Sequence, residues 1–170
     1  ARLAAGQHPA QRRLAFEELL AHQLSLRLLR QAAARDLACP LPGRSDLTAR
    51  YLAQLPFRLT GAQVRVWHEI ERDLAQPHPM MRLVQGDVGS GKTAVAALAA
   101  LRAVEHGAQA AVMAPTELLA EQHARVFNAW LEPLGVRVTL LAGRQTGKIR
   151  AALEADLAAG CPRYLVGLTL

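Results

Sequence analysis

The sequence has 170 residues, of which 51% are hydrophobic, so it is too apolar for a disordered chain and long enough for one ordinary domain or for one domain with an appendage. No apolar run approaches the roughly 20 residues that a membrane-spanning helix needs, which argues against a membrane protein. The net charge of +6 and the pI of about 10.3 permit a nucleic-acid partner but do not establish one, because basic and acidic residues are spread along the whole chain.

The first part of the chain is predicted to be helical. One long helix is expected from Pro9 to Asp36, because proline suits a first helical position and leucines recur at helical spacing. The stretch "CPLPGRSD" (39–46) carries two prolines and a glycine, which indicates a linker or sharp turn, and a short helix is expected over 47–53. We therefore expect residues 1–54 to form a helical connecting segment.

Residues 55–170 are predicted to form a second domain of alternating elements. A helix should begin after Thr60, a good N-cap, and end before "QPHP" (76–79), whose prolines cannot continue it. From residue 80 onward we expect strands at 81–85, 109–114, 136–142 and 163–168, with helices ending near 106 and spanning 116–131 and 148–159. Strands that alternate with helices predict a parallel sheet flanked by helices, the α/β class.

The most informative motif is "GDVGSGKT" (86–93), which satisfies the phosphate-loop pattern G-x-x-x-x-G-K-[ST]. It comprises Gly86, Asp87, Val88, Gly89, Ser90, Gly91, Lys92 and Thr93. The glycines let several backbone N–H groups converge on phosphate oxygens, and the helix that follows directs its positive end at the same anion. Lys92 should reach the β- and γ-phosphates, and the Thr93 hydroxyl should ligate Mg²⁺. Asp87 is expected to face solvent or cap the loop rather than act as a catalytic base.

Two further segments decide between the many proteins that contain such a loop. "LPFRLTGAQ" (55–63) lies upstream of it, and "MAPTELLAEQH" (113–123) lies downstream and is followed by "LLAG" (140–143). With these segments the chain resembles the superfamily 2 helicases, most closely the RecG family of branched-DNA translocases. The stretch "RRLAFEELLAHQL" (12–24) also resembles the connecting helix that precedes the motor in that family, so the resemblance covers essentially the whole chain.

The resemblance implies a RecA-like P-loop NTPase fold and an ATP site. In that site Lys92 and Thr93 would carry the catalytic contacts to phosphate and Mg²⁺. Gln63 matches the glutamine that reads adenine by a two-way hydrogen bond, and Phe57 and Thr60 would help to shape its pocket. An alternative interpretation is that Gln63 is a solvated surface residue.

The resemblance also implies a DNA-contacting edge. Pro115, Thr116 and Glu117 match the motif that lies against the nucleic-acid backbone, and Gly143 belongs to the segment after it. Arg144 is a further candidate for DNA contact, although a lone basic residue after a strand is equally typical of solvated surface. Thr116 could instead serve only as a helix cap.

The function implied is that of a bacterial, cytoplasmic and nucleoid-associated monomer that uses ATP and Mg²⁺ to remodel branched DNA in recombination and repair. The sequence contains no Asp-Glu dipeptide, and so lacks the D-E-x-H motif that such motors need. We therefore expect the chain to be a fragment, comprising the connecting helix and most of the first motor domain, that does not hydrolyse ATP alone. A transcription-repair coupling translocase and a non-hydrolysing ATP-binding module are the alternatives.

Overall fold

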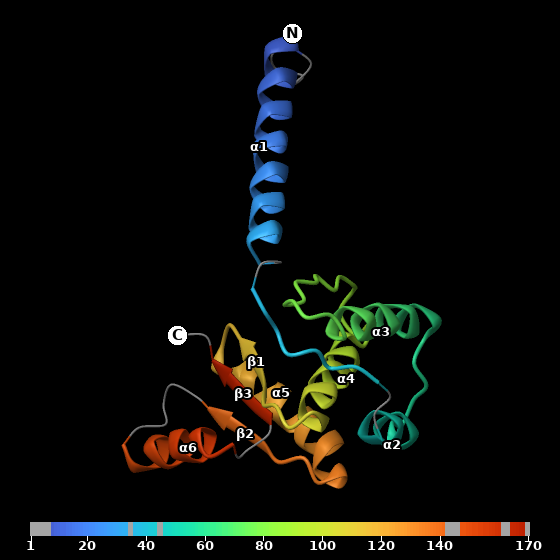
Figure 1. The fold of residues 1–170 in the computed structure, drawn as a ribbon, viewed down its shortest axis with the longest axis vertical. Helices are drawn as coiled ribbons and strands as arrows, with labels where there is room; N and C mark the ends of the chain where they lie inside the picture. The colour runs from blue at the N-terminus through green and yellow to red at the C-terminus, as the bar shows by residue number, and fades with distance from the viewer. Residues whose placement is uncertain (1–7, 34–35, 44–45, 142–146, 161–163, 169–170) are drawn as a thin grey trace. The chain divides into compact units, whose positions relative to one another are not determined.

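The computed structural model describes residues 8–33, 36–43, 46–141, 147–160 and 164–168 (Figure 1). These residues form two compact units. The first contains the described residues of 1–40 together with 76–81, and the second contains those of 41–75 and 82–170. In the described part of the chain, no helix is both long and apolar enough to cross a membrane.

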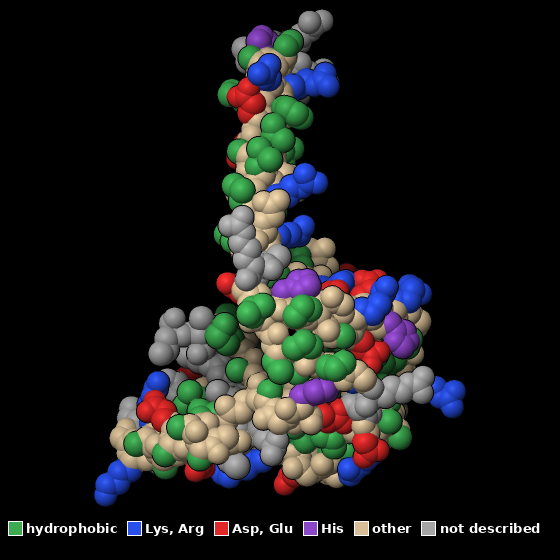
Figure 2. Space-filling view, in the orientation of Figure 1, with side chains coloured by type: hydrophobic (Ala, Val, Ile, Leu, Met, Phe, Trp, Pro, Cys, Tyr) green, Lys and Arg blue, Asp and Glu red, His purple; other side chains and the backbone are tan. Residues whose placement is uncertain are grey.

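The first unit is built on the helix α1 (Pro9–Ala33), which confirms the long N-terminal helix. The described helix runs to Ala33, residues 34–35 lie outside the described residues, and Asp36, the predicted end, lies in a bend. Its leucines form an apolar stripe that remains at the surface, with exposed fractions of 45% for Leu20 and 66% for Leu28, and Figure 2 shows hydrophobic side chains along it.

Three helices form the first half of the second unit: α2 (Asp46–Gln54), α3 (Gly61–Leu74) and α4 (Lys92–Glu105). Both α2 and α3 pack on α4, and the buried side chains of Tyr51, Trp67 and Leu98 form part of their common core. The sequence interpretation grouped α2 with the N-terminal segment, whereas α2 packs on the helix that follows the glycine loop. The domain boundary after residue 54 stays a prediction.

The second half of this unit is a parallel sheet of β1 (Ala110–Ala114), β2 (Val138–Leu141) and β3 (Tyr164–Leu168). Their order is β1-β3-β2, so the last strand in the chain lies in the middle. The helix α5 (Glu117–Leu131) contacts all three strands and continues into a short 3-10 helix, η1 (Glu132–Leu134). With α6 (Lys148–Ala158) between β2 and β3, these elements confirm the expected α/β alternation.

The strand expected at 81–85 is wrong in this structure. Residues 81–87 are irregular, and Leu83 has an exposed fraction of 81%. A parallel strand exists only through hydrogen bonds to a neighbour, and the three strands described here pair only with one another. The apolar composition of this segment therefore indicated a preference for strand conformation that no described neighbour satisfies.

Candidate nucleotide site and nucleic-acid segment

The glycine loop leads directly into α4, and its conformation requires glycine. Gly91 is the N-cap of α4 with φ of 77°, and Gly89 has φ of 80°, values that side-chain-bearing residues rarely adopt. A Cβ atom on Gly91 would also overlap Nε2 of Gln63. The backbone conformation therefore requires glycine at this position, and any side chain there would also displace the amide at the end of the Gln63 side chain.

Among the described residues, no side chain caps the N-terminus of α4. The first N–H groups of a helix have no partner within the helix, and together with the helix dipole they attract an anion. In most helices a serine, threonine or aspartate satisfies one of them. At α4 these groups are left to whatever binds beside Gly91, and phosphate is the ligand that such a terminus suits.

The ammonium group of Lys92 folds back on the loop that precedes it. Its Nζ donates hydrogen bonds to the carbonyl oxygens of Gly86 and Asp87, at 2.5 and 2.7 Å. The Oγ of Ser90 lies 3.5 Å from the same nitrogen. The cation is thus held within the curve of the loop, where it is placed to meet phosphate oxygens. Thr93, the second residue of α4, is half-buried beside it.

Gln63 joins the start of α3 to this loop. Its Oε1 accepts from the backbone N of Thr60 at 2.7 Å, and the Thr60 hydroxyl accepts from the backbone N of Gln63 at 3.3 Å, which together form a capping box. Its Nε2 donates to the carbonyl oxygen of Ser90 at 2.8 Å. Both ends of the amide are therefore engaged, so reading adenine would require Gln63 to exchange these partners for the base. That role stays a prediction.

A hollow of about 360 Å³ lies between α3 and the loop. Of the predicted site residues it brings together Thr60, Gln63, Gly86, Asp87, Ser90 and Lys92. It is also lined by Val66, Val84 and Val95, which the sequence interpretation did not single out. Val66 and Val95 follow Gln63 and Lys92 by three residues on their helices, so helical spacing could have identified them.

Phe57 does not line this hollow. Its ring packs edge-on against Trp130 of α5, with ring centroids 6.3 Å apart, and it borders a different hollow with Leu52 and Pro56. In this conformation Phe57 and Gln63 border different hollows. The expectation that Phe57 helps to shape an adenine pocket therefore stays a prediction.

The segment predicted to contact DNA lies where β1 ends and α5 begins. Pro115 and Thr116 are exposed, and Glu117 is the half-buried first residue of α5. The Thr116 hydroxyl accepts from the backbone N of Leu119 at 3.3 Å, so Thr116 is the N-cap of α5. Gly143 and Arg144, predicted for the same edge, lie outside the described residues. Contact of any of these residues with DNA stays a prediction.

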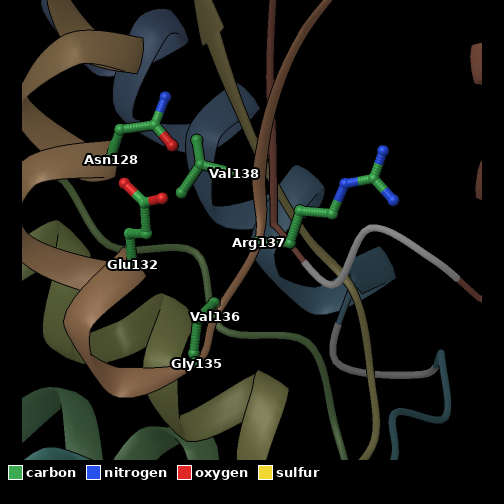
Figure 3. Close-up of a pocket in the computed structure, with 6 residues that line it drawn as sticks. All are labelled: Asn128, Glu132, Gly135, Val136, Arg137 and Val138. Atoms are coloured by element: carbon green, nitrogen blue, oxygen red, sulfur yellow. The ribbon is translucent and has the colours of Figure 1, made fainter.

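A further hollow of about 350 Å³ contains none of the predicted site residues (Figure 3). It lies beside the end of α5 and the start of β2, and is lined by Asn128, Glu132, Gly135, Val136, Arg137 and Val138. In Figure 3 the side chains of Asn128 and Glu132 lie on one side, and the guanidinium of Arg137 points away from them. Its polar groups therefore do not converge on one point, as they do around the glycine loop.

Comparison with known proteins defines the class to which this fold and loop belong. The chain matches the model of the DEAD/DEAH box helicase family over residues 60–169. It therefore belongs to that family.

Within this class the chain is similar to ATP-dependent DNA helicase RecG. It is 62% identical to RecG of Escherichia coli O127:H6 over 165 residues, which are 97% of the chain and 24% of the relative. It is 46% identical to RecG of Bacillus subtilis over 93% of the chain and 23% of the relative. The chain thus spans about a quarter of the length of the curated relatives that it matches.

A solved structure supports the same assignment. The structure of RecG bound to a three-way DNA junction superimposes with a TM-score of 0.83 and 38% identity, covering 92% of this chain and 22% of that one. The resemblance to RecG and the RecA-like P-loop fold expected from the sequence are therefore confirmed.

Proposed function

We propose that this chain is the ATP-binding part of a RecG-type helicase, which uses ATP to remodel branched DNA in recombination and repair. The observation that carries the proposal is the combination at the start of α4: no side-chain cap, a glycine at positive φ, and Lys92 held in the curve of the loop. The relatives, named ATP-dependent DNA helicase RecG, match over 97% of the chain, which includes this loop.

The proposed binding mode uses the glycine loop, the first residues of α4 and Gln63 of α3. The loop and the first amides of α4 bind the phosphates, and Lys92 leaves the carbonyls of Gly86 and Asp87 to neutralise their charge. The Thr93 hydroxyl supplies one hard oxygen ligand, the type that Mg²⁺ prefers, and the nucleotide phosphates supply others. Gln63 exchanges its bonds to Thr60 and Ser90 for bonds to adenine.

The proposed DNA contacts lie at the start of α5. Pro115, Thr116 and Glu117 contact the nucleic-acid backbone, with Gly143 and Arg144 on the same edge. Such contacts position a protein on DNA without reading its sequence, which suits an enzyme that recognises branched shape. In this proposal the protein acts in the bacterial cytoplasm, at the nucleoid, as a monomer.

A full-length helicase that includes this chain provides the test. Its rate of ATP hydrolysis should be stimulated more by a three-way DNA junction than by linear duplex of the same length. Lys92→Ala should lower the stimulated rate by about 100-fold or more, because a charged group that meets the reacting phosphate is lost. Arg137→Met, which removes an exposed arginine away from the hollow, is the matched control. Equal rates on both DNAs would refute the branched-DNA proposal, and an active Lys92→Ala variant would refute the site.

A further inference from the structure

Arg102 is an unusual residue in the packing of the second unit. Its side chain on α4 has an exposed fraction of 2%, and it is the largest of the fully buried side chains in the described part of the chain. Arginine is almost never fully buried unless it is paired. Here Nη2 donates to Oε1 of Glu71, and the guanidinium carbon lies 5.8 Å from the ring centroid of Trp67. Both contacts reach α3.

These contacts contribute less to stability than their number suggests. Among the described residues, Nε and Nη1 of Arg102 have no hydrogen-bond partner. A buried cation with unpaired donors stabilises a fold poorly, and a well-packed apolar side chain often does better. Glu71 is also contacted by Nδ1 of His68 at 3.2 Å, so its carboxylate is held in place from its own helix. The presence of a buried arginine is therefore better explained by its fixing the orientation of α3 relative to α4 than by a contribution to stability.

The residues of α3 that contact Arg102 lie on the same face of that helix as Gln63, which lines the nucleotide hollow. On α3, Trp67 and Glu71 follow Gln63 by four and eight residues, which places all three on one face. On α4, Arg102 lies ten residues beyond Lys92, or about 15 Å along the helix axis. The hollow therefore lies at the N-terminal ends of two helices that Arg102 connects further along their length.

We infer that Arg102 is a positioning residue that fixes α3 against α4 and thereby sets the spacing between Gln63 and Lys92. This inference rests on the proposed function, in which Gln63 reads adenine and Lys92 binds phosphate. A guanidinium that meets both a carboxylate and an indole ring has a defined orientation. Loss of that orientation lets α3 shift, which separates the base contact from the phosphate contacts.

The proposed phosphate contacts lie outside α3, and the described bond from α3 to the loop, Gln63 Nε2 to the carbonyl oxygen of Ser90, is one that Gln63 gives up in the proposed binding mode. All of them come from residues 86–93, in the loop and the first turn of α4. A ligand that has phosphates but no base should therefore bind equally well when α3 is free to shift. The ratio between the affinities of an ATP analogue and inorganic tripolyphosphate thus reports on the spacing alone.

The experiment measures both dissociation constants, by calorimetry with Mg²⁺ present, for the 170-residue chain and for Arg102→Met. Methionine keeps an unbranched apolar stem beside Trp67 and removes the cation. The affinity for the ATP analogue should fall about tenfold, which corresponds to about 1.4 kcal/mol, while tripolyphosphate affinity should change less than about twofold. Arg137→Met, which removes an exposed arginine paired with Asp156, should change neither. Arg102→Lys should restore part of the preference for the ATP analogue over tripolyphosphate, because it keeps the charge beside Glu71.

A second variant, Glu71→Gln, allows the same test if Arg102→Met does not fold. It retains a hydrogen-bond acceptor at the more exposed end of the pair, and should lower the same ratio by a smaller factor. An unchanged ratio in folded Arg102→Met or Glu71→Gln would overturn the inference and leave the proposed function intact. Two variants that both fail to fold would overturn it too, since the contact would then serve folding. A parent chain that binds neither ligand would instead refute the phosphate site.

Discussion

The two helices that begin at the proposed contact sites, α4 and α5, begin in different ways. Gly91 starts α4 with no side-chain cap, whereas the Thr116 hydroxyl accepts a hydrogen bond from Leu119 at the start of α5. A capped helix has satisfied one of its free N–H groups within the protein, and an uncapped one leaves it for a ligand. The difference is consistent with the proposal that the start of α4 binds phosphate, whereas Thr116 has a structural role whether or not DNA is also bound there.

The largest effect is expected from Gly91→Ala, which tests whether the uncapped start of α4 binds the nucleotide. The new Cβ would overlap Nε2 of Gln63, and the φ of 77° is strained for alanine. The amide of Gln63 can move aside, but the backbone strain remains and distorts the loop, so affinity for an ATP analogue should fall about 100-fold, the loss of one or two charge-assisted hydrogen bonds.

Gly135→Ala is the matched control for that experiment. Gly135 has the same φ of 77°, but no heavy atom lies within 4 Å of the added Cβ. Alanine there should lower the free energy of unfolding by about 1 to 2 kcal/mol, from backbone strain alone, and leave nucleotide affinity unchanged. Calorimetry and thermal denaturation of both variants provide the measurement. Equal loss of affinity in the two would contradict a specific role for Gly91.

At the capped helix, α5, mutation of the N-cap should lower stability and leave nucleotide affinity unchanged. Thr116→Ala removes the side-chain acceptor for the Leu119 N–H, so the free energy of unfolding should fall by about 1 kcal/mol. Binding of the ATP analogue should not change, and Thr116→Ser should restore stability because it keeps the hydroxyl. Urea denaturation followed by circular dichroism measures the first effect. A loss of nucleotide affinity in Thr116→Ala would show that the two helix starts are not independent.

The smallest effect is expected at Tyr51, a buried residue of α2, which packs against α4. Its hydroxyl is buried without a hydrogen-bond partner among the described residues, so Tyr51→Phe should change stability by less than about 1 kcal/mol near neutral pH.

Alkaline pH should separate Tyr51→Phe from the parent chain. Burial raises the pKa of the Tyr51 phenol above its usual value near 10, so the unfolded chain loses this proton before the folded one does. Above about pH 10, the free energy of unfolding of the parent should therefore fall relative to the variant, by at most about 1.4 kcal/mol per pH unit. Parallel curves from pH 8 to 11 would contradict the burial of this hydroxyl.

The sequence predicted those elements whose ends are determined locally. Thr60 and Thr116 cap the helices that they were expected to begin, because a capping hydroxyl acts within three residues of its own position. The loop residues lie together because they are consecutive in the chain, and their role in binding phosphate stays a prediction. The strand at 81–85 was wrong because strand formation depends on a neighbour in space.

Contacts between distant parts of the chain could not be predicted in this way. Nothing in the pattern around Phe57 indicates that its ring meets Trp130 on α5. The pairing of Arg102 with Glu71, 31 residues earlier, is equally invisible, because an arginine within an apolar helix is typical of solvated surface. Such contacts depend on how α3, α4 and α5 pack together, which local spacing does not specify.

The central claim is that the loop at the start of α4, with Lys92, binds the phosphates of a nucleotide. Its most direct test is calorimetric titration of the 170-residue chain with a non-hydrolysable ATP analogue and Mg²⁺, with and without Lys92→Ala. The mutation removes the cation that now bonds to Gly86 and Asp87, so affinity should fall by about 10- to 100-fold, or 1.4 to 2.8 kcal/mol. Equal affinity in the two proteins would contradict the claim.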